Sequence, residues 1–187
     1  APFSTIYRLY NQGFAFVDNT IELLKTLTEV DGVPGYENEI RAVLDQYLAP
    51  LGDVSRDNLG SLICRQPGDG PKVMLAGHMD EVGFMITHIT KDGYLRFVQL
   101  GGWWDQVLLG HRVVVKTRQG GVVGVIGAKP PHLLAIEERN KVVKKKDMYI
   151  DIGATTQADV EAAGVRIGDA VVPKADFQVL ASGKTFL

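Results

Sequence analysis

Apolar positions in the first fifty residues recur at helical spacing. The first predicted helix follows Asp18 and Asn19, two residue types that favour helix N-caps, and carries its apolar side chains at Ile21, Leu24, Leu27 and Val30. A turn is predicted at 32–35, where proline fixes φ and the glycines permit positive φ. A second helix is predicted from Glu37 to a stop at Pro50, with an apolar face formed by Ile40, Val43, Leu44, Tyr47 and Leu48.

The pattern changes from helical to strand-like after Asn58. Residues 61–65 and 72–76 are predicted to be strands joined by the turn-forming residues 67–71. Segment 72–76 is short, almost entirely apolar and followed by Gly77, which is typical of a central strand covered on both faces by helices. Two helices followed by paired strands predict an α/β layer.

Short strands separated by glycine turns dominate the segment from 84 to 173. Two hairpins are predicted, one around Asp92-Gly93 (84–89 with 94–98) and one around 119–121 (112–116 with 122–126). Further short strands are predicted at 148–152 and 170–172, and one helix over 157–163 between Thr156 and Gly164. This pattern favours a compact barrel or sandwich. The predicted fold class is therefore α/β, with an α/β domain over 17–83 and 174–187 that is interrupted by an inserted, barrel-like β domain over 84–173.

Composition and charge exclude several classes of function. The 187 residues carry 20 Lys+Arg against 22 Asp+Glu, a net charge of −2, so no basic excess favours nucleic-acid binding. No apolar run approaches the roughly 20 residues that cross a bilayer, which predicts no membrane association. Cys64 is the single cysteine, which excludes an internal disulfide. Residues 1–16 contain no apolar core of a signal peptide. We therefore expect a cytoplasmic protein.

The stretch with the most chemical content is GHMDEVGF at 77–84, directly after the predicted strand 72–76. In an open α/β sheet, ligands bind at this end of a strand. His78 and Asp80 are two residues apart, so an extended backbone places them on the same side, whereas Glu81 points the other way. Such a pair suits a metal ligand and the carboxylate that orients it. The alternative is a hydrogen-bonded histidine at a strand end with solvated acids.

Six motifs in order connect the chain to a known family. They are GVPG (32–35), DNLGS (57–61), GHMDEVGF (77–84), GGWW (101–104), GAKPPH (127–132) and DMYIDIGA (147–154). Together they resemble the glutamyl or deblocking aminopeptidases, also called tetrahedral aminopeptidases or endoglucanase M, from about Val17 to Leu187. The residues before Val17 match no part of this pattern, and we interpret 1–16 as an extension.

The resemblance implies a metallopeptidase that removes N-terminal residues from peptides with two divalent ions, usually zinc or cobalt. His78 matches the first metal ligand, and Asp80 matches the carboxylate that orients it. The remaining ligands and the general base belong to motifs downstream of the point that matches Leu187, so only the front half of the enzyme is matched. The resemblance also implies assembly into homo-oligomers, from dimers to dodecamers, through the inserted β domain.

Two consequences follow for these 187 residues. Without the other ligands and the general base, we expect the chain by itself to lack peptidase activity. We also expect exposed apolar surface where segment 72–76 lacks cover. One alternative function is a non-catalytic assembly or binding module, in which the β domain is the working part. An endoglucanase is a weaker alternative, because Asp80 and Glu81 point to opposite sides and do not form a pair of facing carboxylates.

Overall fold

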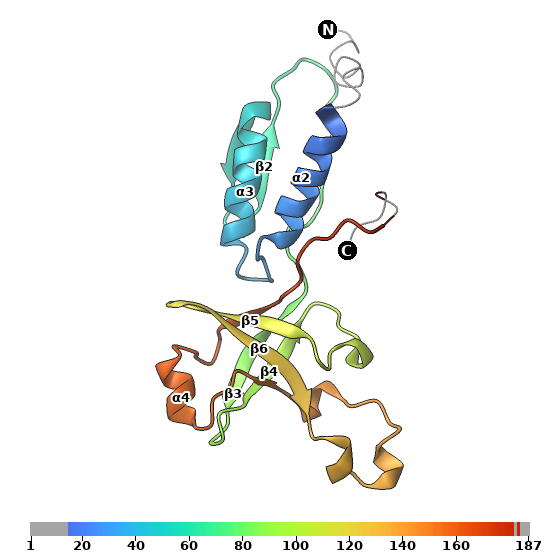
Figure 1. Cartoon of the computed structure of the whole chain (residues 1–187). Helices are drawn as coiled ribbons and strands as arrows, with labels where there is room; N and C mark the ends of the chain where they lie inside the picture. The colour runs from blue at the N-terminus through green and yellow to red at the C-terminus, as the bar shows by residue number, and fades with distance from the viewer. Residues whose placement is uncertain (1–14, 182, 184–187) are drawn as a thin grey trace. The chain divides into compact units, whose positions relative to one another are not determined.

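The computed structural model describes residues 15–181 and 183 (Figure 1), and the chain divides into two compact units. The smaller unit comprises the residues before Asp31 and those after Ala175. It contains α2 (Ala15–Glu29), and the Phe177 N–H donates to Glu29 Oε1 at 3.0 Å. The first predicted helix is thus confirmed, but it begins before Asp18, because Ala15 to Val17 contain no helix breaker. The predicted extension lies outside the described residues except for Ala15 and Phe16, which belong to α2.

The larger unit, Asp31 to Ala175, begins with the second predicted helix. This helix, α3 (Asn38–Leu48), passes into the short 3₁₀ turn η1 (Ala49–Leu51), which contains Pro50 and confirms the predicted stop. Two antiparallel strands follow, β1 (Asp53–Arg56) and β2 (Leu62–Arg65). The Arg41 guanidinium of α3 donates to the Gly60 carbonyl at 2.8 Å and so fixes the turn between these strands.

The predicted central strand over 72–76 is wrong. Residues 71–82 have no regular secondary structure, and β2 pairs with β1 instead. The physical reason is that a strand exists only where another backbone completes its hydrogen bonds, and no described segment pairs with 72–76. Its apolar side chains, Val73, Met74 and Leu75, are 81, 87 and 94% exposed, which agrees with the expected uncovered apolar surface.

Six strands form a closed barrel, which confirms the barrel expected from the short strands. Its strands occur in the spatial order β3-β4-β7-β6-β5-β8, and β3 pairs with β8 to close it. Both predicted hairpins are present, although the second turns at Arg118-Gln119 and its glycines already pair within β6. The strand bounds are β3 (Gly83–Ile89), β4 (Leu95–Leu100), β5 (Arg112–Thr117), β6 (Gly120–Ala128), β7 (Met148–Asp151) and β8 (Ala170–Pro173).

The barrel encloses the main hydrophobic core of the larger unit. Its buried side chains include Phe84, and the Trp103 ring stacks on Phe84 with centroids 5.0 Å apart. The helix α4 (Gln157–Ala162) contributes Val160 to this core and begins with a capping box between Thr156 and Asp159, as the sequence predicts for its N-terminus. Further core members are Ile86, Leu95, Leu108, Val113, Val115, Ile126, Met148, Ile150, Val165 and Val171.

The loop that carries the 32–35 turn packs closely on the barrel. Val33 is 1% exposed and lies in a small apolar cluster with Ala170 and Val172 of β8. At Gly83, the first residue of β3, there is no room for a side chain. An added Cβ would lie 2.3 Å from Val33 Cγ1 and 2.6 Å from the Val171 carbonyl oxygen. The absence of a side chain at 83 therefore permits the loop and the barrel to touch.

We predict that Gly83→Ala destabilises the larger unit by about 1–3 kcal/mol, because the new methyl group would force Val33 or β8 to move. Urea unfolding followed by circular dichroism measures the loss. Gly68→Ala is the matched control, since no atom lies within 4 Å of its added Cβ. Equal stability of the two variants would contradict the close approach.

Candidate metal-binding segment

His78 and Asp80 lie together, as the sequence predicts. His78 Nδ1 is 3.0 Å from the Asp80 carbonyl oxygen and 3.2 Å from Asp80 Oδ1. Both of these neighbours accept hydrogen bonds, so Nδ1 carries the ring proton. In the neutral imidazole, Nε2 then keeps its lone pair, which is the state that binds a metal ion.

The pair offers a metal ion one candidate ligand position, Nε2 of His78. The His78 side chain is 83% exposed and that of Asp80 39% exposed, so the outer edge of the imidazole is accessible. In the part of the chain that the structure describes, no group of three or more His, Cys, Asp and Glu side chains is placed to hold a metal ion. His88, His111 and His132 accordingly do not join His78. The donor chemistry fits one imidazole ligand with its orienting carboxylate, and a complete site needs further donors.

Glu81 has a role that sequence reasoning missed. Its backbone N–H donates to the Gly32 carbonyl oxygen at 2.7 Å, and the Gly32 N–H donates to Glu81 Oε1 at 3.2 Å. These reciprocal bonds tie the His78 segment to the loop before α3. The two residues are 49 positions apart in the chain, and no local pattern signals such a contact.

Burial raises the pKa of Glu81 above its ordinary value, and repulsion from Asp31 acts in the same direction. The hydrogen bond from the Gly32 N–H opposes this by favouring the carboxylate. Burial is the larger effect, so Glu81 holds its proton more strongly in the folded chain than in the unfolded one.

The two neighbouring tryptophans lie in different environments. Trp103 packs on the barrel core, and its indole N–H donates to the Gly83 carbonyl at 3.1 Å, whereas Trp104 is 68% exposed. Trp103 is therefore part of the packing around the core, whereas Trp104 is not. Within the described ranges, no helix combines the length and the apolar character that crossing a bilayer requires.

Known proteins share both this sequence and this architecture. The profile of the M42 glutamyl aminopeptidase family matches residues 60–186. FrvX of Escherichia coli strain K12 is 45% identical over 159 residues, which are 84% of this chain and 45% of FrvX. A TET aminopeptidase from a marine sediment archaeon of the Thaumarchaeota is 48% identical with a TM-score of 0.84, over 88% of this chain and 47% of that one.

A third relative is a TET1 peptidase from Pyrococcus horikoshii, described as able to assemble into a tetrahedron or a large octahedral shell. It is 38% identical with a TM-score of 0.77, over 87% of this chain and 48% of that one. The fold thus resembles that of solved aminopeptidases. The chain belongs to the M42 glutamyl aminopeptidase family. It spans about half the length of the curated relatives that it matches.

We predict that Glu81→Gln stabilises the fold at neutral pH, because glutamine still accepts a hydrogen bond from the Gly32 N–H and removes a partly buried charge. Since the pKa of Glu81 is raised by folding, its protonated form favours the folded state below the ordinary value of 4.5, and this contribution is lost as pH rises through the folded value. The stability advantage of Glu81→Gln should therefore be absent at low pH and grow above 4.5.

Melting temperatures of both proteins across this pH range provide the measurement. The exposed Glu137→Gln serves as the control and should show no such growth. A Glu81→Gln advantage that shrinks toward neutral pH would contradict the burial argument.

Proposed function

We propose that this chain forms the front part of a dinuclear-metal aminopeptidase that removes N-terminal residues from peptides. His78 serves as a metal ligand, and Asp80 orients its imidazole. The observation that carries the proposal is the position of His78 Nδ1, within 3.2 Å of two Asp80 oxygens, in a chain of the M42 glutamyl aminopeptidase family.

In this proposal His78 donates a lone pair to the cation and Asp80 fixes the tautomer of the imidazole. Asp80 accepts a hydrogen bond from the Nδ1–H group, so the proton stays on Nδ1 and the Nε2 lone pair is free for the cation. The negative charge of Asp80 also favours the binding of a cation beside it. When bound, divalent zinc or cobalt supplies the Lewis acidity that peptide hydrolysis requires.

A two-ion centre needs more than this chain's described residues provide. Two divalent cations a few Å apart repel each other strongly unless anionic ligands lie between and around them. A general base is needed as well. We propose that these groups come from sequence that follows the matched region in the longer relatives, and that the exposed segment 72–76 finds its strand partners there.

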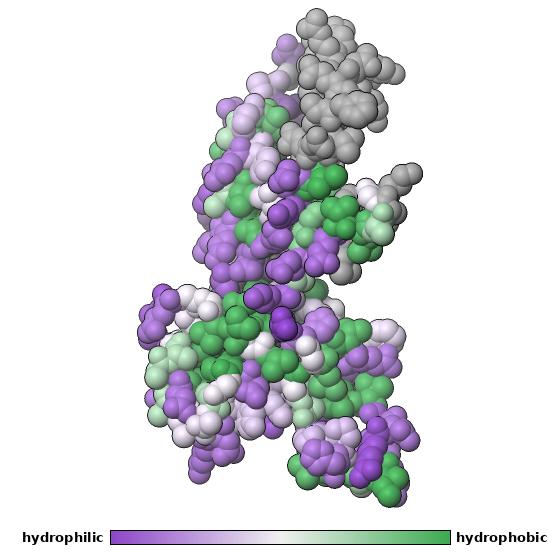
Figure 2. Space-filling model, in the orientation of Figure 1, coloured by the Kyte–Doolittle hydropathy of each residue, from purple (hydrophilic) through white to green (hydrophobic). Residues whose placement is uncertain are grey.

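The barrel is proposed to be an inserted domain that mediates homo-oligomerisation. Several large apolar side chains between β4 and β8 are exposed, which supports this proposal: Trp104 (68%), Leu133 (58%), Ile136 (73%) and Ile167 (62%). Figure 2 shows apolar surface on this part of the chain. The same exposed side chains favour the second candidate function, a non-catalytic assembly module. A loss of metal binding in His78 variants would favour the metallopeptidase over the non-catalytic module.

We predict that His78→Ala abolishes high-affinity cobalt binding in the full-length natural protein. Asp80→Asn should weaken it about 10–100-fold, because the amide orients the imidazole without supplying negative charge. Isothermal titration with cobalt measures both effects. His88→Ala, which removes an exposed imidazole from β3, is the matched control and should bind as the natural protein does. Unchanged cobalt affinity in His78→Ala would refute the assignment.

We predict that the 187-residue chain alone does not hydrolyse aminoacyl chromogenic substrates in the presence of zinc or cobalt, whereas the full-length natural protein does. The reason is the incomplete ligand set among the described residues. Release of the chromophore is followed spectroscopically, and the His78→Ala chain provides the background rate. Turnover by the 187-residue chain well above that background would show that it needs no further groups.

A further inference from the structure

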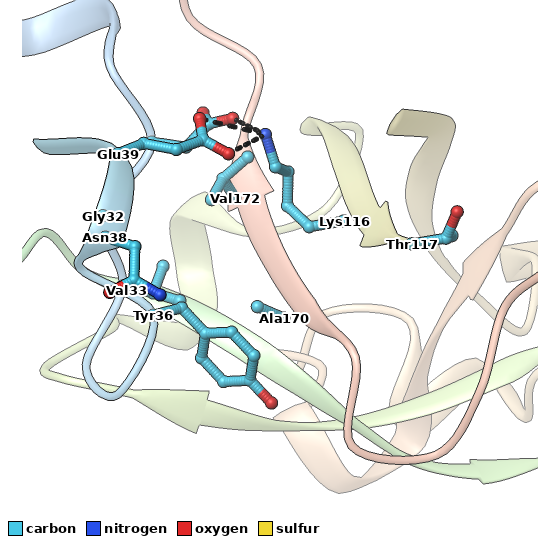
Figure 3. Close-up of a pocket in the computed structure, with 10 residues that line it drawn as sticks. Gly32, Val33, Tyr36, Asn38, Glu39, Lys116, Thr117, Ala170 and Val172 are labelled. Carbon is cyan, nitrogen blue, oxygen red and sulfur yellow. Dashed lines mark hydrogen bonds and ion pairs between the residues drawn. The ribbon is translucent and has the colours of Figure 1, made fainter. Parts of the chain in front are cut away.

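A lysine of the barrel contacts both the loop before α3 and the first turn of that helix. Lys116 of β5 places its Nζ 2.5 Å from Asp31 Oδ2 and 3.1 Å from Glu39 Oε1. These side chains form one wall of a pocket of about 200 Å³ (Figure 3). The Lys116 and Asp31 side chains are each only 31% exposed, so water screens their attraction less than at an open surface.

The same loop is attached to the barrel at two other points. The Tyr36 hydroxyl donates to the Gly168 carbonyl, just before β8, and Val33 is buried against Ala170 and Val172. Residues 31–39 are therefore held by an ion-pair cluster, a hydrogen bond and an apolar contact. Asp31, one member of this ion-pair cluster, directly precedes Gly32 in the sequence.

Gly32 connects this loop to the segment 71–82, which contains His78. It makes the two reciprocal hydrogen bonds with Glu81, and Glu81 directly follows Asp80, the partner of His78. Residues 71–82 have no strand ladder or helix of their own to locate them. A segment of this kind is located by the tertiary contacts that it makes, and the bonds to Gly32 are such contacts.

We propose that Lys116 is a positioning residue for the metal ligand His78. By holding Asp31 and Glu39 it keeps Gly32 in place, and Gly32 keeps Glu81 and thus the His78–Asp80 pair in place relative to the barrel. This inference rests on the proposed function, in which His78 binds metal. Lys116 itself touches neither metal nor substrate; it acts through the backbone of the loop.

The electrostatics of Lys116 agree with this role. Burial alone favours the neutral amine, but the hydrogen bonds to Asp31 and Glu39 outweigh it and raise the pKa of Lys116. The ammonium group therefore stays charged, and the ion-pair cluster persists, at neutral pH.

The first test is amide hydrogen exchange in the full-length natural protein without metal. Lys116→Met should speed exchange at the Gly32 and Glu81 amides on the order of tenfold, as expected for loss of a charged hydrogen bond. Exchange in the barrel strands β5 and β6 should stay unchanged, and Lys116→Arg should restore protection. Asp31→Asn removes the same ion pair from the other side and should reproduce the Lys116→Met pattern if that variant fails to fold.

Lys145→Met is the matched control. Lys145 is another partly buried lysine of the larger unit. It pairs with Asp105 and donates to the Trp103 carbonyl at 2.8 Å, and neither of these partners belongs to residues 31–39. Its loss should leave the Gly32 and Glu81 amides protected. Uniformly faster exchange across the barrel in Lys116→Met, or no change at Gly32 and Glu81, would overturn the proposal, because the lysine would then act only on general stability or not at all.

The second test is cobalt affinity of the same full-length variants. We expect Lys116→Met to weaken binding about tenfold, Lys116→Arg to restore it and Lys145→Met to leave it unchanged. Unchanged affinity in Lys116→Met, despite faster local exchange, would overturn the positioning role. Failure of the proposed function is recognised separately: His78→Ala would then retain full cobalt affinity, whatever the exchange experiment shows.

Discussion

The close contact between the 31–36 loop and the start of β3 is the constraint on which the rest of the larger unit depends. Val33 is buried there against β8, and Gly83 has no side chain that would keep the two backbones apart. Gly83 directly follows the irregular stretch 71–82 that contains His78, and the hydrogen bonds between Glu81 and Gly32 attach the end of that stretch to the same loop. Packing and chemistry are therefore coupled at a few residues.

The His78–Asp80 pair illustrates how much a small local arrangement can determine. Two acceptor oxygens at Nδ1 select the tautomer, and the tautomer decides which ring nitrogen can bind a cation. A single imidazole does not balance the mutual repulsion of two divalent ions. The proposal that the pair belongs to a two-ion centre therefore depends on the family to which the chain belongs. The curated relatives in that family are about twice as long as this chain.

The elements that sequence reasoning predicted correctly are those with local physical causes. Asp92-Gly93 forms a hairpin turn because glycine accepts the positive φ found at Gly93, and Thr156 begins α4 because its hydroxyl accepts the Asp159 N–H. The prediction of a strand over 72–76 was wrong because a strand depends on non-local contacts. Its apolar run satisfies the composition of a buried strand, but a strand also needs a neighbouring backbone, which composition does not reveal.

The sequence by itself determined the barrel hairpins, the helix over 38–48, the family and the His78–Asp80 pair, because each depends on residues close together in the chain or on an ordered set of motifs. Only the tertiary structure decided that β1 is the partner of β2, that Lys116 meets Asp31 and that Glu81 meets Gly32. The ion pair and the Glu81 contact join residues 85 and 49 positions apart, and such contacts arise from chain packing, which no local pattern of side chains encodes.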